Sequence, residues 1–164
     1  MALPEDRLIP EEKFPEKLRK LIGRDAPKSA QLMVARGALP MPPVVQLAAL
    51  YQLHKTGDAE LKSESEATLR KLPAGVVRQL ATEPMLPIVL DWMAVVFQDA
   101  QDVLETLVQN RATDDDTVVL LARTANDGLC EAIARNQERL LRSPAIIEAL
   151  YYNCLLYTSD AADE

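Results

Sequence analysis

Three stretches of the chain repeat one order of apolar and polar positions. Each places two apolar residues before a glutamate, followed by a small residue, an apolar residue, two free positions and an asparagine. The stretches are 103–110, 129–136 and 146–153, with Glu105 and Asn110, Glu131 and Asn136, and Glu148 and Asn153 at the fixed polar positions. Such self-similarity is typical of helical units that bury their apolar faces against neighbouring units.

The spacing of apolar residues predicts short helices along most of the chain. Four helices are expected at about 15–23, 27–39, 43–54 and 58–72, each bounded by Pro or Gly. Beyond residue 72, pairs of adjacent apolar residues recur every 11 to 17 residues. The pairs begin at Val76, Val89, Val103, Val118, Leu129 and Ile146. Each interval fits one short helix and a turn, so the predicted fold is all-α, an α-solenoid-like array of short antiparallel helix pairs.

Polar residues mark the expected helix ends. Asn110 and Asn136 follow the last apolar residue of their units, where Asn in the left-handed conformation ends many helices. Side-chain acceptors and negative charge are favoured at helix starts. The expected starts are Asp58, Asp99 with Asp102, Thr113 with Asp116, and Ser143 followed by Pro144.

Composition narrows the class of protein. The chain has 164 residues, 48% hydrophobic and 4% aromatic, with a net charge of -7. This balance favours a folded domain and argues against a general nucleic-acid binder, which needs a basic face. No apolar run is long enough for a membrane span, and the N-terminus lacks a signal-peptide pattern, so we expect a cytoplasmic protein.

The two ends of the chain differ from its middle. Residues 1–12 are acidic and Pro-rich and are expected to form an extended arm, followed by a single helical-repeat domain over 13–153. Residues 154–164 resemble one translated reading frame of a transposon-end adapter used in sequencing libraries. The hypothesis is that this tail is not native and that the domain is truncated, leaving an apolar repeat edge prone to self-association.

Part of the pattern resembles known repeat families. Asp58, Leu61, Lys62, Ser65 and Leu69 are similar to positions of the second helix of HEAT-like repeats. Residues 109–113 with the following apolar positions resemble the Asn-Pro-x-Thr-Pro turn of leucine-rich-repeat-variant proteins, without its two prolines. Residues 134–150 are similar to uncharacterised bacterial helical-repeat proteins of deltaproteobacterial type, a resemblance extended over 7–153. This resemblance supplies no catalytic residues that could be assigned to positions of this chain.

The polar residues of the sequence do not form a recognisable catalytic or metal-binding motif. His54 is the only histidine and cannot by itself build a zinc site, so it is interpreted as a helix-end cation. The run 114–116 of three aspartates lacks the spacing of a calcium loop and is interpreted as helix capping. Glu105, Glu131 and Glu148 are expected to form a ladder along the stack rather than an opposed catalytic pair.

Other residues have a structural and a binding interpretation. Cys130 lies within an apolar stretch and is interpreted as a small buried hydrophobic residue. Trp92 is expected in the core, with a partner groove as the alternative. The lysines and arginines between 13 and 28 alternate with acidic residues, which favours a mixed solvated face over a phosphate patch.

Taken together, these patterns predict a non-catalytic protein–protein interaction or scaffold module. The expected partner is another protein, and no cofactor, metal or nucleic acid is expected. The interaction or repeat positions are Trp92, Glu105, Asn110, Glu131, Asn136, Glu148 and Asn153. The alternative is a regulatory or accessory domain of a larger signalling or nucleic-acid-related protein.

Overall fold

The computed structural model describes the backbone of residues 8–160 and the side chains of residues 8–154, and this part is all-α. A 3-10 turn, Glu11–Lys13, precedes eleven helices. They are α1 (Glu16–Ile22), α2 (Lys28–Ala35), α3 (Pro43–Thr56), α4 (Ala59–Lys71), α5 (Ala74–Thr82), α6 (Pro87–Val96), α7 (Gln101–Gln109), α8 (Asp115–Ala122), α9 (Asp127–Ala134), α10 (Gln137–Arg142) and α11 (Pro144–Asp160).

Helix α3 organises the N-terminal part of the molecule. It packs against α1, α2 and α4, and it also contacts α5 and α6 of the following part. This helix is apolar on several sides, with Leu47, Leu50 and Leu53 fully buried, which suits a helix surrounded by neighbours. The expected arm lies partly against it, since Ile9 is buried and exchanges two backbone hydrogen bonds with the Gln52 side chain.

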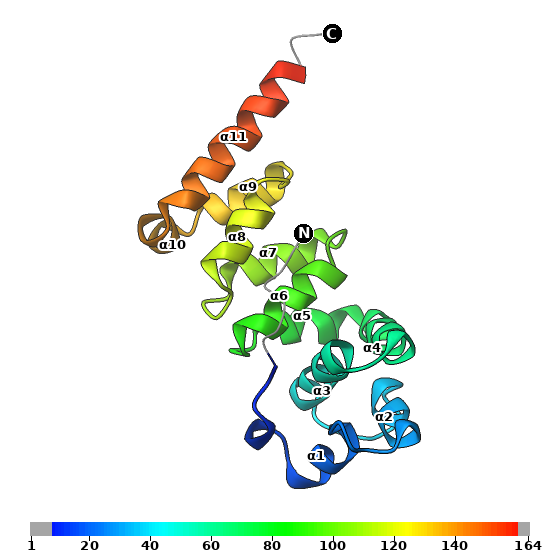
Figure 1. The fold of residues 1–164 in the computed structure, drawn as a ribbon. Coiled ribbons are helices and arrows are strands. Elements are labelled where there is room, and N and C mark those ends of the chain that lie inside the picture. Colours follow the sequence, from blue (N-terminus) through cyan, green and yellow to red (C-terminus); the bar gives the residue numbers. More distant parts are fainter. Residues whose placement is uncertain (1–7, 161–164) are drawn as a thin grey trace.

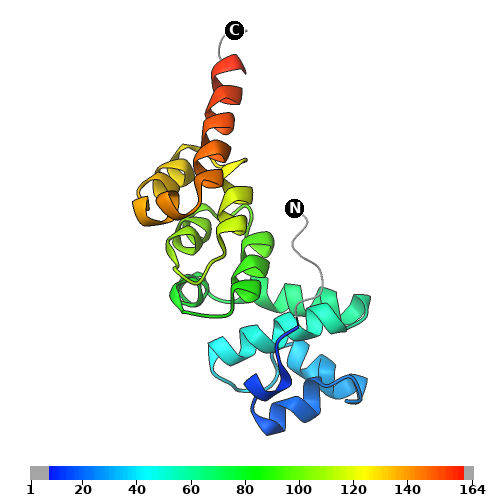
Figure 2. The ribbon, with the colours of Figure 1, turned by 60° about the vertical axis from the view of Figure 1, so that its left-hand side comes forward.

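From α5 onward, the helices pack mainly against helices one to three places away along the chain. Helix α7 packs between α5 and α9, while α8 packs against α9 and α11. The resulting body is elongated, with α1 to α4 at one end and α10 and α11 at the other (Figures 1 and 2). The all-α prediction is confirmed, and the arrangement is solenoid-like in its sequential layering.

One apolar core runs through these layers, from Ile9 to Ala149. Leu, Val, Ile and Ala supply most of it, as short helices packed closely without large anchors require. Trp92 belongs to this core and is 3% exposed; its ring lies against Tyr51 and His54, with centroids 5.9 and 5.0 Å away. The partner groove considered for Trp92 is therefore wrong.

Two helix boundaries differ from the sequence prediction. Helix α2 ends at Ala35, four residues early, because Gly37 adopts a φ of 67° and the amides of Gly37 and Ala38 bond to Val34 and Met33. The longest interval between apolar pairs holds two helices. Asn136 starts the additional one, α10, by accepting a hydrogen bond from the Arg139 amide.

Some predicted helix starts are confirmed and others are wrong. Asp58 caps α4 by accepting from the Leu61 amide. Helix α7 begins after Ala100 without a side-chain cap, so Asp102 contributes only negative charge to its first turn. The Thr113 hydroxyl donates to the Leu107 carbonyl oxygen at 2.7 Å rather than capping α8.

Candidate interaction surfaces

The three repeated glutamates do not form one ladder. Glu105 and Glu131 lie on the neighbouring helices α7 and α9, but Glu148 lies on α11, which packs against α8. The first and second copies of the phrase begin 26 residues apart, whereas the second and third begin 17 apart, and the helix of the third copy packs mainly against α8. Glu105 accepts from the Gln101 side chain at 2.8 Å, and Glu131 pairs with Arg135 one turn later. The predicted ladder is therefore wrong at its third position.

The three repeated asparagines hold turns together. Asn110 donates to the carbonyl oxygens of Ala81 and Glu83 at 2.7 and 2.9 Å, which ties the end of α7 to the end of α5. Asn153 is buried and donates to the Ala125 carbonyl oxygen at 2.7 Å. Asn110 and Asn136 have φ values of -69° and -86°, so the predicted left-handed conformation is wrong for both.

A buried arginine lies beside the turn that contains Asn110, and the sequence analysis did not predict it. Arg139 is 2% exposed, and its guanidinium donates to the carbonyl oxygens of Asn110 and Thr113, each at 2.8 Å. It also contacts Asp115 at 2.6 Å, and Asp115 receives a second, two-point contact from Arg142. The hydrogen bonds from Arg142, with the charge of Arg139, hold the pKa of Asp115 below its ordinary value.

The remaining polar candidates lie apart from one another and have separate roles. The described residues contain no group of three His, Cys, Asp or Glu side chains placed to hold a metal ion. Burial, with a smaller effect of Lys55, lowers the pKa of His54, so this side chain does not act as the expected helix-end cation. Burial also raises the pKa of the partly buried Cys130 thiol, which disfavours its thiolate form.

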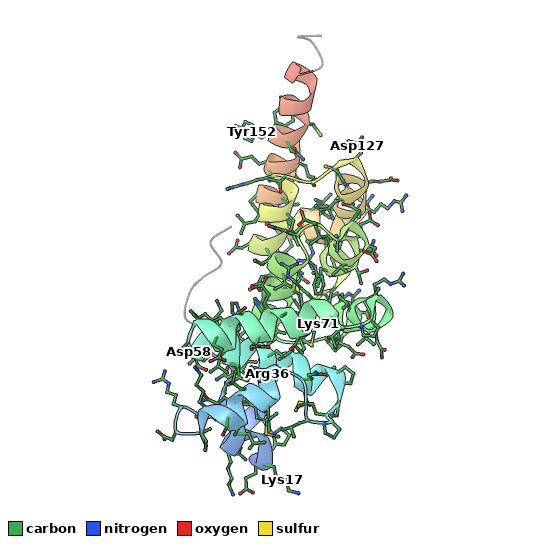
Figure 3. All side chains as sticks on the ribbon, turned by 90° about the vertical axis from the view of Figure 1, so that its right-hand side faces the viewer. Lys17, Arg36, Asp58, Lys71, Asp127 and Tyr152 are labelled. Atoms are coloured by element: carbon green, nitrogen blue, oxygen red, sulfur yellow. The ribbon has the colours of Figure 1, made fainter. Side chains whose placement is uncertain are left out.

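The charges near the N-terminal end are paired across helices. Lys28 contacts Asp58 and Glu60 at 2.6 and 2.7 Å, and Arg36 contacts Glu64 at 3.3 Å. Figure 3 shows Arg36 and Asp58 on this part of the molecule. Of the basic residues between 13 and 28, Lys28 is paired in this way and Lys20 lies 3.2 Å from Glu16. The mixed, solvated face stays a prediction for the others.

A cleft opens where α6 and α8 end and α7 and α9 begin. It has a volume of about 550 Å³, and we call it the α6–α9 cleft. Its lining is mostly apolar toward the core and polar at the rim. The residues are Ala94, Val95, Gln98, Asp99, Gln101, Leu104, Leu120, Leu121, Arg123, Thr124, Asn126 and Leu129.

A second surface is apolar and exposed. Four of the seven large hydrophobic side chains exposed in the described part of the chain lie on α10 and α11: Leu141 (84%), Ile147 (50%), Tyr151 (61%) and Tyr152 (58%). We call these four residues the α10–α11 surface. Figure 3 shows Tyr152 at the end of the molecule opposite Lys17. Beside it, residues of α8 and α11 line a hollow of about 410 Å³.

Comparisons with protein-family models, curated proteins and solved structures gave no match. Within the described residues, no helix combines the length and the apolar character that crossing a membrane requires.

Proposed function

We propose that this protein is a non-catalytic protein-interaction module, acting in the cytoplasm, whose contact region is the α10–α11 surface. The exposure of Leu141, Ile147, Tyr151 and Tyr152 carries the proposal. Single exposed hydrophobic residues are ordinary, but a group of them at one place marks a binding site. Tyrosine is enriched in interfaces because its ring contributes apolar area while its hydroxyl remains hydrogen-bonded.

The hollow between α8 and α11 supplies a complementary shape. Val119, Ala145 and Ala149 give it an apolar floor, while Arg123 and Glu148 stand at its edge. Neither charged side chain makes an ion pair within the described residues, whereas most charges on the neighbouring helices are paired. A partner that places an apolar side chain in the hollow can therefore also gain charge contacts.

Self-pairing is the first interaction expected from this geometry. In a two-fold symmetric dimer, residues of one patch meet the same patch of the partner copy. Arg123 of one copy can then face Glu148 of the other, twice per dimer, around the apolar contact. The alternative of a regulatory domain within a larger protein stays a prediction, without a separate feature in its support.

Light scattering coupled to size exclusion tests the proposal on the chain alone. The apparent mass is expected to rise above 18.2 kDa with concentration. Tyr151→Asp should hold the chain as a monomer, because it places a charge in the apolar contact. Met33→Asp is the matched control, since Met33 is 49% exposed on α2 and its replacement should leave self-association unchanged. A monomer at every concentration, or equal behaviour of the two variants, contradicts the proposal.

A further inference from the structure

The α6–α9 cleft has the size and lining of a small-molecule site. Its volume of about 550 Å³ lies within the range of about 300–1,000 Å³ typical of ligand pockets. Much of its floor is formed by four leucines: Leu104, Leu120, Leu121 and Leu129. An apolar group that binds there is removed from water, which is favourable.

Two opposite charges stand unpaired on the rim of this cleft. Asp99 follows the end of α6 and Arg123 follows the end of α8, and neither side chain makes an ion pair or hydrogen bond within the described residues. Nearby charges behave differently: Asp102 lies 3.8 Å from Arg78, and Glu131 pairs with Arg135. The cleft thus keeps one anion and one cation available beside an apolar floor.

Hydrogen bonds hold the polar side chains of the cleft wall in place. The Asn126 amide donates to Gln101 at 2.8 Å, and the Gln101 amide donates in turn to Glu105 at 2.8 Å. The Asn126 oxygen is also committed, because it caps α9 by accepting from the Leu129 amide. Glu105, one of the repeated glutamates, therefore orients the cleft wall rather than contacting a ligand. A wall fixed before binding lowers the entropic cost of binding.

We infer that the α6–α9 cleft binds a short apolar peptide with a free amino group and a free carboxylate. Its carboxylate contacts Arg123, whose planar guanidinium suits two-point recognition of a carboxylate. Its ammonium group contacts Asp99, and its aliphatic side chains cover the leucine floor. The leucine floor of this cleft is separate from the α10–α11 surface, but Arg123 lies on the rim of the cleft and also at the edge of the hollow beside that surface.

The test uses the whole chain and the tripeptide Leu-Ala-Leu as probe, with binding followed by NMR shift perturbation. The peptide with free ends is expected to bind, and its amidated and its acetylated forms about tenfold or more weakly, because each loses a charge-assisted hydrogen bond. Arg123→Gln should bind the free and amidated peptides equally, and Asp99→Asn the free and acetylated peptides equally. Arg111→Gln, an exposed arginine outside the cleft, is the control.

Two results overturn the inference. One is equal binding of all three peptides, and the other is the absence of binding by any of them at millimolar concentration. Repeating the titration with Tyr151→Asp separates this site from self-association, since that variant is expected to stay monomeric and still bind the peptide.

Discussion

Asn110 and Arg139 meet at one atom, the carbonyl oxygen of Asn110, which accepts from Nη2 of Arg139 at 2.8 Å. The Asn110 side chain donates in the other direction, to the backbone at the end of α5. The turn between α7 and α8 is therefore held by a helix before it and by a helix after it. This contact joins three successive layers of the molecule through hydrogen bonds rather than apolar packing alone.

Replacing Arg139 should destabilise the protein strongly. Arg139→Met keeps much of the apolar length but removes the Arg139 donor from the buried Thr113 carbonyl oxygen. It also removes one of the two donors to the Asn110 carbonyl oxygen, which still accepts from the Thr113 amide. The free energy of unfolding is expected to fall by about 2–4 kcal/mol, the range for breaking a buried charged contact. Urea unfolding followed by Trp92 fluorescence measures it. Arg135→Met, at an exposed position directly after the end of α9, should change the value by less than about 0.5 kcal/mol. A loss below 1 kcal/mol at Arg139 would refute this role.

The repeated asparagines are expected to differ in energetic weight. Asn110→Ala removes two side-chain donors to neighbouring backbone and one acceptor for the Ala112 amide. We expect a loss of about 2–3 kcal/mol, against about 1 kcal/mol for Asn136→Ala, which removes only a helix cap. Thermal and urea unfolding of the two variants compare them directly. Equal losses would show that Asn110 does not bridge α5 and α7.

Two glycines should respond to alanine in opposite directions. Gly37 has a φ of 67°, and a Cβ there would lie 2.9 Å from Nε2 of Gln46, so Gly37→Ala should cost about 1–2 kcal/mol. Gly75 lies in α5 with no heavy atom within 4 Å of the added Cβ, so Gly75→Ala should stabilise by about 0.5–1 kcal/mol. Midpoints of urea unfolding decide the signs, and a destabilised Gly75→Ala would oppose the described start of α5.

His54 should make stability depend on pH near neutrality. Burial lowers its pKa in the folded state, with Lys55 and Lys62 acting in the same direction and Glu66 opposing them. The folded state then binds fewer protons than the unfolded state just below pH 6.5. Stability is therefore fully present above that pH and is lost as the pH falls through the folded pKa. Urea unfolding between pH 5 and 7.5 measures the slope, which His54→Gln should reduce. An unchanged slope in that variant would assign it to another group.

Much of the fold follows from local patterns in the sequence. Pro and Gly at the helix boundaries and the Asp58 cap act over a few residues, so α1, α3 and α4 are predicted to within two residues at their ends. The core position of Trp92 follows equally from the apolar run around it.

The contacts that organise the candidate surfaces could not be predicted in this way. Arg139 lies in a polar six-residue segment, and its burial depends on the Asn110 and Thr113 carbonyl oxygens brought to it by folding. Helix α11 packs against α8, which separates Glu148 from Glu105 and Glu131 on α7 and α9. A repeated sequence pattern predicts which face of a helix is apolar, but it does not predict which neighbouring helix packs against that face.

The central claim is that the α10–α11 surface is the contact region of this protein. Hydrogen exchange of the chain at low and high concentration, read by mass spectrometry, tests it most directly. The account predicts that concentration slows exchange in segment 137–154 and at the end of α8, and leaves α1 to α4 unchanged. Slowing confined to α1 to α4, or no slowing in 137–154 while the apparent mass rises, would contradict it.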